Sequence, residues 1–301
     1  MKMKYRFRIK WSKVLFALLS FGRAWLPAQT IDSYIGTYSG ENKNGYLRPV
    51  ASVISSAFNT GQVTHTKLDS NFRVYFHLIG TASFILGDGL KYFDGTTPEG
   101  FQPSKTISAP TLLGPRESVT VEGINGTAYT FPAGMGIRML SLVVPQLSLA
   151  YGKTELNFRF AWGDTDDEIG RINYWGLGLR HDLGQYLMPD APWLLSVGGM
   201  YQKIKVGTYA NLSAYNASLT AGQEWRHVYY FFQAGYQAGN LKSQYNYFNG
   251  ENKEVVKVDL SSDNPLFIGA GLGLKLGFLQ LQWQVQGYEP VIGSFALGFR
   301  F

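Results

Sequence analysis

The chain has 301 residues, no cysteine, 35 glycines and only 16% charged residues, with a formal net charge of +6. Without cysteine, disulfides, zinc–thiolate sites, iron–sulfur sites and the lipid-bearing cysteine of a lipoprotein are excluded. Seven of the 27 basic residues lie in residues 1–28, which contain no acidic residue, so the remainder has 20 basic and 21 acidic residues. This near-neutral balance gives no indication of a nucleic-acid partner.

The N-terminus has the plan of a secretory signal peptide. Basic residues precede the apolar run "VLFALLSF", and a stretch ending "WLPAQT" follows it. Cleavage is expected after Ala28. An uncleaved anchor is the less favoured alternative, because the apolar run is far shorter than the roughly 20 residues that cross a bilayer. We therefore exclude residues 1–28 from the predicted fold.

Residues 29–60 form a separate N-terminal segment in this interpretation. Residues 29–45 are polar and rich in glycine, whereas "YLRPVASVISSAFN" at 46–59 has apolar residues close to helical spacing. Pro49 is tolerable in a first helical turn, and Gly61 follows the expected end. The segment predicts one short amphipathic helix, which either caps one end of the fold or plugs its interior.

Residues 61–301 are dominated by a side-chain period of two, which predicts strands. The clearest case is "LQLQWQVQ" at 279–286, where apolar residues and glutamines occupy opposite faces. Similar segments are 72–78, 155–162, 174–180, 215–222, 228–237, 266–277 and 294–301. Weaker candidates near 118–131, 134–143, 145–152, 194–205 and 253–259 bring the expected number to between 10 and 14 strands.

Such alternation suits either a soluble sandwich or a membrane barrel, and the end of the chain favours the barrel. Phe295, Leu297, Phe299 and Phe301 resemble the terminal signal that the barrel assembly machinery reads in outer-membrane proteins. With the leader, this predicts an all-β fold: a transmembrane antiparallel β-barrel in the outer membrane of a Gram-negative bacterium. Its apolar face would contact outer-membrane lipid, with Trp162, Trp175 and Trp225 in the interfacial aromatic girdles.

The opposite face of these strands would line the lumen. The candidate lumen-lining residues are Arg73, His77, Arg159, Arg180, Lys275, Gln280, Gln282, Gln284 and Gln286. In a small barrel such charges pair with inward carboxylates such as Glu155, whereas in a wider barrel they would set the selectivity of a pore.

Motifs for chemistry are weak, and we expect no catalytic residues, metal or cofactor. The four histidines lack a metal-ligand spacing, and "RHD" at 180–182 is explained as a polar turn better than as an acid–base pair. "GDTDDE" at 163–168 could collect a calcium ion but departs from the calcium-loop pattern, which favours a solvated hairpin. "GAGLGLKLG" at 269–277 lacks the ending of a phosphate loop and favours inward glycines.

The stretches "GYLRPVASVISSAFNTG", "FPAGMGIRMLSLVVPQLSLAYGKTELNFRF" and "GRINYWGLGLRHDLGQYL" resemble an uncharacterised outer-membrane barrel family of Bacteroidetes-type bacteria. The plan of a helical N-terminal segment plus a barrel is similar to FadL-like transporters of hydrophobic compounds. The resemblance implies no established activity or site.

Two non-enzymatic functions are expected from these patterns. The first is a passive channel or carrier for an unidentified small molecule, with hydrophobic compounds among the candidates, which the polar inward face favours. The alternative is a non-transporting barrel that anchors or scaffolds a surface or secretion assembly, which the long irregular stretch 87–115 favours. A filled interior would favour the scaffold, and a continuous path or apolar pocket would favour transport.

If the leader is cleaved as expected, the mature protein begins at or near Gln29. Mass spectrometry of protein purified from membranes should give the mass of residues 29–301. Recovery of a chain that still begins at Met1 would contradict the signal-peptide interpretation.

Overall fold

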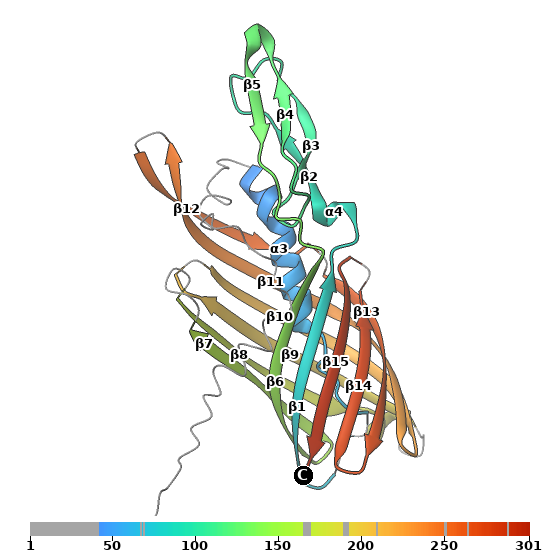
Figure 1. Ribbon diagram of the computed structural model, residues 1–301. Coiled ribbons are helices and arrows are strands. Elements are labelled where there is room, and N and C mark those ends of the chain that lie inside the picture. The colour runs from blue at the N-terminus through green and yellow to red at the C-terminus, as the bar shows by residue number, and fades with distance from the viewer. Residues whose placement is uncertain are drawn as a thin grey trace, which may run out of the picture.

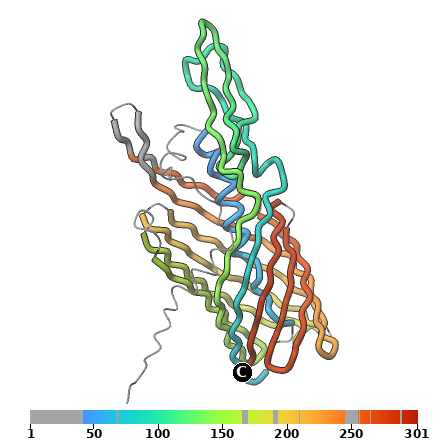
Figure 2. The backbone as a smooth tube through the Cα atoms, viewed as in Figure 1, coloured from blue at the N-terminus to red at the C-terminus, as the bar shows by residue number. Residues whose placement is uncertain are grey.

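The computed structural model describes residues 42–301, except 67, 69, 165–169, 189–192, 209, 250–251, 264 and 288. The expected signal peptide therefore lies outside the described residues. The described part is a β-barrel with a helix inside its upper half and a narrow extension above it (Figure 1 and Figure 2). No helix in these described ranges has the length and apolar character needed to cross a membrane.

The barrel is closed by ten antiparallel strands, which confirms the predicted fold class. Pairing runs in the order β10-β9-β8-β7-β6-β1-β15-β14-β13-β11, and β11 pairs back with β10. The wall strands are β1 (Arg73–Phe84), β6 (Met139–Tyr151), β7 (Thr154–Asp164), β8 (Arg171–Asp182), β9 (Trp193–Val206), β10 (Ala210–Trp225), β11 (Val228–Asn249), β13 (Leu266–Leu276), β14 (Leu279–Gln286) and β15 (Val291–Arg300). Phe301 continues this closure, because its backbone N–H donates to Val74 O at 2.9 Å. Its role as an assembly signal stays a prediction.

The two ends of the barrel differ. At the lower end, two-residue turns join β6 to β7, β10 to β11 and β13 to β14. In the first of these, Gly152 and Lys153 have φ values of 57° and 65°, the left-handed conformations that a tight hairpin requires. Helix α5 (Gly184–Leu187) lies in a longer lower connection, between β8 and β9. The upper end carries the long connection between β1 and β6 and the hairpin of β11 with β12 (Asn252–Ser261).

The upper wall is divided. Pairing of β6 with β7 stops at Gln146 and Arg159, although β6 continues upward to Met139 and β7 to Asp164. On the other side, β11 pairs with β13 as far as Tyr236 and with β12 from Asn240. Strand β6 therefore joins the second half of the candidate 134–143 to the candidate 145–152. Pro145, which lies at their junction, is tolerated because β6 has no partner strand on its β7 side at that position, so the missing N–H breaks no hydrogen bond to β7.

Helix α3 (Asn42–Asn59) occupies the space between the two upper parts of the wall (Figure 1). It begins four residues before the expected position, so Pro49 lies inside the helix and not in its first turn. Asn42 exchanges two hydrogen bonds with Thr96 of the extension, which holds this added turn. Gly61, at φ 72°, follows the end of the helix as expected.

Residues 85–138, here called the hairpin extension, rise above the upper end. They contain α4 (Asp88–Lys91), the hairpin β2 (Tyr92–Thr96) with β3 (Thr106–Pro110), and the hairpin β4 (Val119–Glu122) with β5 (Ala128–Phe131), joined by the turn η1 (Ile124–Gly126). The candidate strand near 118–131 is thus a small separate hairpin and not a wall strand, because each of its strands has only four residues. The stretch 87–115 is ordered in the same way, into α4 and the first hairpin.

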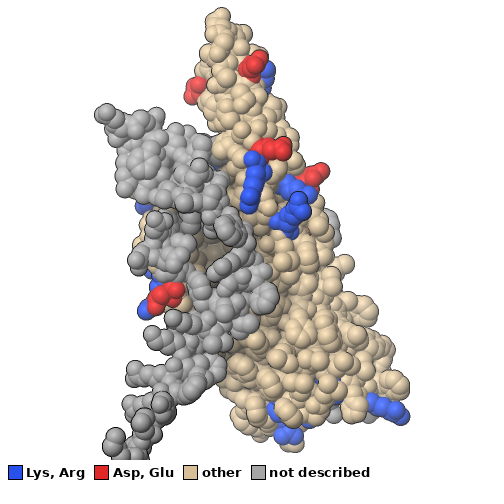
Figure 3. Space-filling model, in the orientation of Figure 1, with Lys and Arg blue, Asp and Glu red and all other residues tan. Residues whose placement is uncertain are grey.

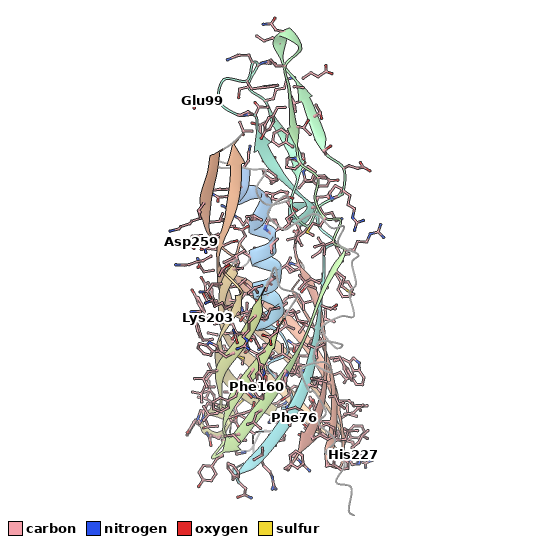
Figure 4. All side chains as sticks on the ribbon, turned by 60° about the vertical axis from the view of Figure 1, so that its left-hand side comes forward. Phe76, Glu99, Phe160, Lys203, His227 and Asp259 are labelled. Atoms are coloured by element: carbon pink, nitrogen blue, oxygen red, sulfur yellow. The ribbon has the colours of Figure 1, made fainter. Side chains whose placement is uncertain are left out.

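The outer wall is apolar at mid-height. Phe76 and Phe160, labelled in Figure 4, are 37% and 38% exposed, in line with their outward parity. On the face drawn in Figure 3, basic side chains gather at the lower end and charges of both signs gather where the extension begins, with an uncharged surface between. Such a band is what hydrocarbon contact requires.

Inward glycines in β13 make room for large side chains of β11. A Cβ at Gly273 would overlap the Tyr229 ring, and one at Gly271 would overlap Phe231.

We expect Gly273→Ala to lower the free energy of unfolding by about 1–3 kcal/mol, because Tyr229 must shift in a filled interior. Urea titration followed by the heat-modifiable fraction on gels would measure this. Gly163→Ala is the control, since its Cβ would meet nothing within 4 Å; equal loss in both variants would refute the packing argument.

Candidate functional site: the filled lumen

The centre of the lumen is occupied by the end of α3 and the residues that follow it. Arg159, which projects inward from β7, donates to Phe58 O at 2.8 Å, Thr60 O at 3.2 Å and Gly61 O at 2.8 Å. Its Nε donates to Gln146 Oε1 at 2.8 Å. Because the last carbonyls of a helix have no partner within the helix, Arg159 caps the end of α3 at Phe58 O from the barrel wall, and it also holds the two residues Thr60 and Gly61 that follow the helix.

Two further wall residues hold the same segment. Gln202 of β9 donates to Phe58 O at 2.8 Å, and Asn216 of β10 donates to Asn59 O at 3.1 Å. Phe58 also packs on Tyr174, with ring centroids 4.9 Å apart. The contacts come from adjacent strands and converge on one turn of backbone, so this turn is fixed at mid-height.

Below this level, an ionic cluster fixes the descending chain. His65 Nε2 lies 2.7 Å from Glu155 Oε2, and Arg180 Nη2 lies 3.2 Å from the same oxygen. Arg180 Nη1 also donates to His65 O at 2.8 Å. His77 stacks beside His65 with ring centroids 6.4 Å apart, and its Nε2 lies 3.4 Å from Gln280 Oε1. All of these side chains are buried.

The glutamine ladder of β14 faces inward along its length, and all four glutamines are buried. Gln284 Nε2 donates to Gln233 Oε1 at 3.2 Å. Gln286 Nε2 lies 3.4 Å from Gln237 Oε1, and Gln237 donates to Ser56 of α3 at 3.0 Å. Gln282 accepts from the Tyr229 hydroxyl at 3.3 Å. The ladder therefore joins neighbouring strands and the helix, and does not line open water.

The other two predicted lumen-lining residues lie near the lower end. Arg73, at the start of β1, has the inward parity but is exposed at the rim. Lys275 is half-buried, pairs with Glu224, and lies with its Nζ 5.6 Å from the centre of the Tyr229 ring.

Four residues of this site carry no functional signal in the sequence: Gln146, Gln202, Asn216 and Tyr229. Gln146 and Gln202 lie in segments that alternation predicts only weakly as strands. Inward parity could have found Asn216 and Tyr229, but their contacts to Asn59 and Thr64 depend on where the helix ends, which parity does not give.

The weak sequence motifs have structural explanations wherever the structure describes their residues. In "RHD", His181 Nδ1 lies 2.8 Å from Thr154 Oγ1 and Asp182 accepts from Gly184 N at 2.9 Å, so the two do not form a pair. Residues 165–168 of "GDTDDE" lie outside the described residues, and Asp164 pairs with Arg171 at 2.9 Å. Residues 269–276 lie within β13. Within the described ranges, no group of acidic residues and histidines is arranged to hold a metal ion.

The family model described as "Family of unknown function (DUF6588)" matches residues 8–301. The chain belongs to this family. The expected resemblance to an uncharacterised outer-membrane barrel family is thereby confirmed. Among curated proteins, no sequence matches that of this DUF6588 member.

Solved structures with a similar fold include outer-membrane barrels of several kinds. The protease OmpT from Escherichia coli is 7% identical, with 78% of this chain and 98% of that chain covered and a TM-score of 0.33. The translocator domain of the autotransporter NalP from Neisseria meningitidis is 10% identical, with 77% and 89% covered and a TM-score of 0.26. A Pseudomonas aeruginosa FadL homologue is 6% identical, with 76% and 90% covered and a TM-score of 0.24.

Arg159 provides a direct test of the filled lumen. Arg159→Ala leaves the carbonyls of Thr60 and Gly61 without their donor and removes one of the two donors to Phe58 O, so we expect the free energy of unfolding to fall by at least about 3 kcal/mol. We also expect flickering ion conductance in planar bilayers, where the parent protein should stay closed. Arg171→Ala, which removes an exposed arginine at the upper rim, is the control and should behave as the parent. Unchanged stability and conductance in Arg159→Ala would contradict the proposed capping role.

Proposed function

We propose that the protein is a non-enzymatic anchor in the outer membrane of a Gram-negative bacterium, which holds the hairpin extension at the cell surface. One observation supports this most: helix α3 packs on the lumen wall and on the extension within one continuous apolar cluster. At its upper end, Tyr46 and Leu47 lie in the same cluster as Ala109 and Phe131 of the extension. At its lower end, the helix is capped by Arg159.

The shape of the barrel supports this location and orientation. Outer-membrane barrels have short turns on the periplasmic side and longer loops outside, and this barrel has its two-residue turns at the lower end. The extension would then face the medium, and insertion would depend on the barrel assembly machinery. A lumen filled by buried, hydrogen-bonded side chains supports an anchor better than an open pore.

A passive carrier of a small molecule is the second candidate. It is favoured by a cavity of about 250 Å³ beside α3, lined by Ser56 and Gln286 on the polar side and by Ile268 and Pro290 on the apolar side. Transport through the lumen would require α3 to move, because its end is held by three wall strands. Solute uptake by liposomes containing the parent protein would favour this candidate over the anchor.

The orientation can be tested by labelling, because the parent chain has no cysteine. Ile124 lies in the turn η1 of the extension and is 55% exposed, and Phe278 lies in a lower turn and is 66% exposed. In intact cells, a membrane-impermeant maleimide should label Ile124→Cys. It should label Phe278→Cys only after the outer membrane is permeabilised. The reverse pattern would refute the proposed surface role of the extension.

A further inference from the structure

A basic pocket lies at the upper rim of the barrel wall. Its volume is about 450 Å³, and it lies where the turn between β9 and β10 meets the taller hairpin of β11 and β12. Its charged lining residues are Lys205, Lys242, Lys257 and Asp259. Gly207 and Ala210 also line it, and these small residues leave the hollow open.

Strand register brings these side chains together. Lys205 pairs in register with Asn211, Asn211 with Lys242, and Lys242 with Asp259. One outward row therefore crosses four neighbouring strands. Lys203 lies two residues below Lys205 on the same face of β9, and Figure 4 shows it on the same side of the molecule as Asp259, above Phe160. The arrangement is set by the sheet and not by a flexible loop.

The pocket carries more positive than negative charge. Asp259 accepts from Asn240 Nδ2 at 2.5 Å and lies 3.3 Å from Lys242 Nζ. The hydrogen bond from Asn240 and the contact with Lys242 lower the pKa of Asp259, so this carboxylate stays ionised and neutralises Lys242. Lys205 and Lys257 have no acidic partner among the described residues. Two lysine charges thus remain for an anion.

The height of the pocket on the wall indicates what kind of anion. Trp175, Tyr201 and Tyr215 face outward just below the lysine row, on β8, β9 and β10. Trp175 and Tyr201 pack on each other, with ring centroids 5.5 Å apart. Tryptophan and tyrosine gather at the level where hydrocarbon meets headgroups. The lysines immediately above them would lie at the headgroup level of the upper leaflet.

We propose that this pocket binds the phosphate group of a glycolipid in the outer leaflet of the outer membrane, through Lys205 and Lys257. The proposal rests on the proposed location and orientation of the barrel. Ammonium groups bind phosphate oxygens through charge-assisted hydrogen bonds, and a lipid held by its acyl chains presents that phosphate at a fixed height. The lipid would fasten the barrel at its upper rim, on the side of the β11 and β12 hairpin.

Lipopolysaccharide titrated into the purified full chain in detergent tests this proposal. Lys205→Gln/Lys257→Gln should bind lipopolysaccharide about thirtyfold more weakly than the parent, a loss of about 2 kcal/mol for two basic residues near anionic headgroups. The control Lys153→Gln/Arg226→Gln removes two charges from turns at the opposite rim and should bind as the parent does. Lipopolysaccharide stripped of phosphate should bind the parent as weakly as intact lipopolysaccharide binds the first variant.

Equal binding of the two double variants, or of intact and phosphate-free lipopolysaccharide, would overturn the proposal. Full competition by millimolar inorganic phosphate would also overturn it, because the pocket would then be a site for soluble phosphate. Heat-modifiable folding of every variant shows that the barrel is intact. Labelling of Ile124→Cys in cells tests the orientation separately, so failure of lipid binding alone leaves the anchor role standing.

Discussion

The structure depends on how hydrogen-bond donors reach the carbonyl groups at the end of a helix that stops inside the barrel. The last carbonyls of any α-helix lack partners in the helix, and at the centre of a filled barrel the donors must come from the wall or from the chain that follows the helix. Arg159 and Gln202 both donate to Phe58 O, and Asn216 donates to Asn59 O. Thr60, just after the helix, donates to Ser56 O and Ala57 O, and Arg159 in turn donates to Thr60 O. A guanidinium suits this position, because its planar set of donors reaches several oxygens at once and its charge opposes the negative end of the helix dipole.

The division of the upper wall follows from the same helix. Pairing between β6 and β7 ends at Gln146 and Arg159, the level at which the helix is capped. Above it, Val144 and Tyr174 of the wall lie in the same apolar cluster as Phe58 of the helix. Side-chain packing on α3 thus replaces strand pairing where the wall parts. Pro145 fits the same account, since it occupies a position with no ladder partner on that side.

Sequence periodicity was sufficient for the wall and insufficient for its contents. Alternation placed Gln280 to Gln286 on the inward face because the parity of a strand is a local property. The contacts of Arg159 depend on the depth at which α3 ends, which is a long-range property. In the hairpin extension, alternation indicates only a weak strand at 118–131 and nothing at the first hairpin, for a different reason: these strands have four or five residues each, too few for alternation to stand out among glycines and prolines.

The helix also determines how the surface extension and the lumen are linked. A Cβ at Gly45 would overlap the Phe93 ring of β2, and Leu112 N donates to Tyr46 O at 3.0 Å, so the extension packs directly on the helix backbone. Near the other end of α3, Gly239 of β11 admits Ser55 equally closely. The contacts at both ends of α3 involve backbone atoms at close range, so the helix has no room to slide along its axis. A movement of α3 large enough to open the lumen would therefore have to disturb the extension as well, so the closed barrel and the position of the extension depend on the same helix.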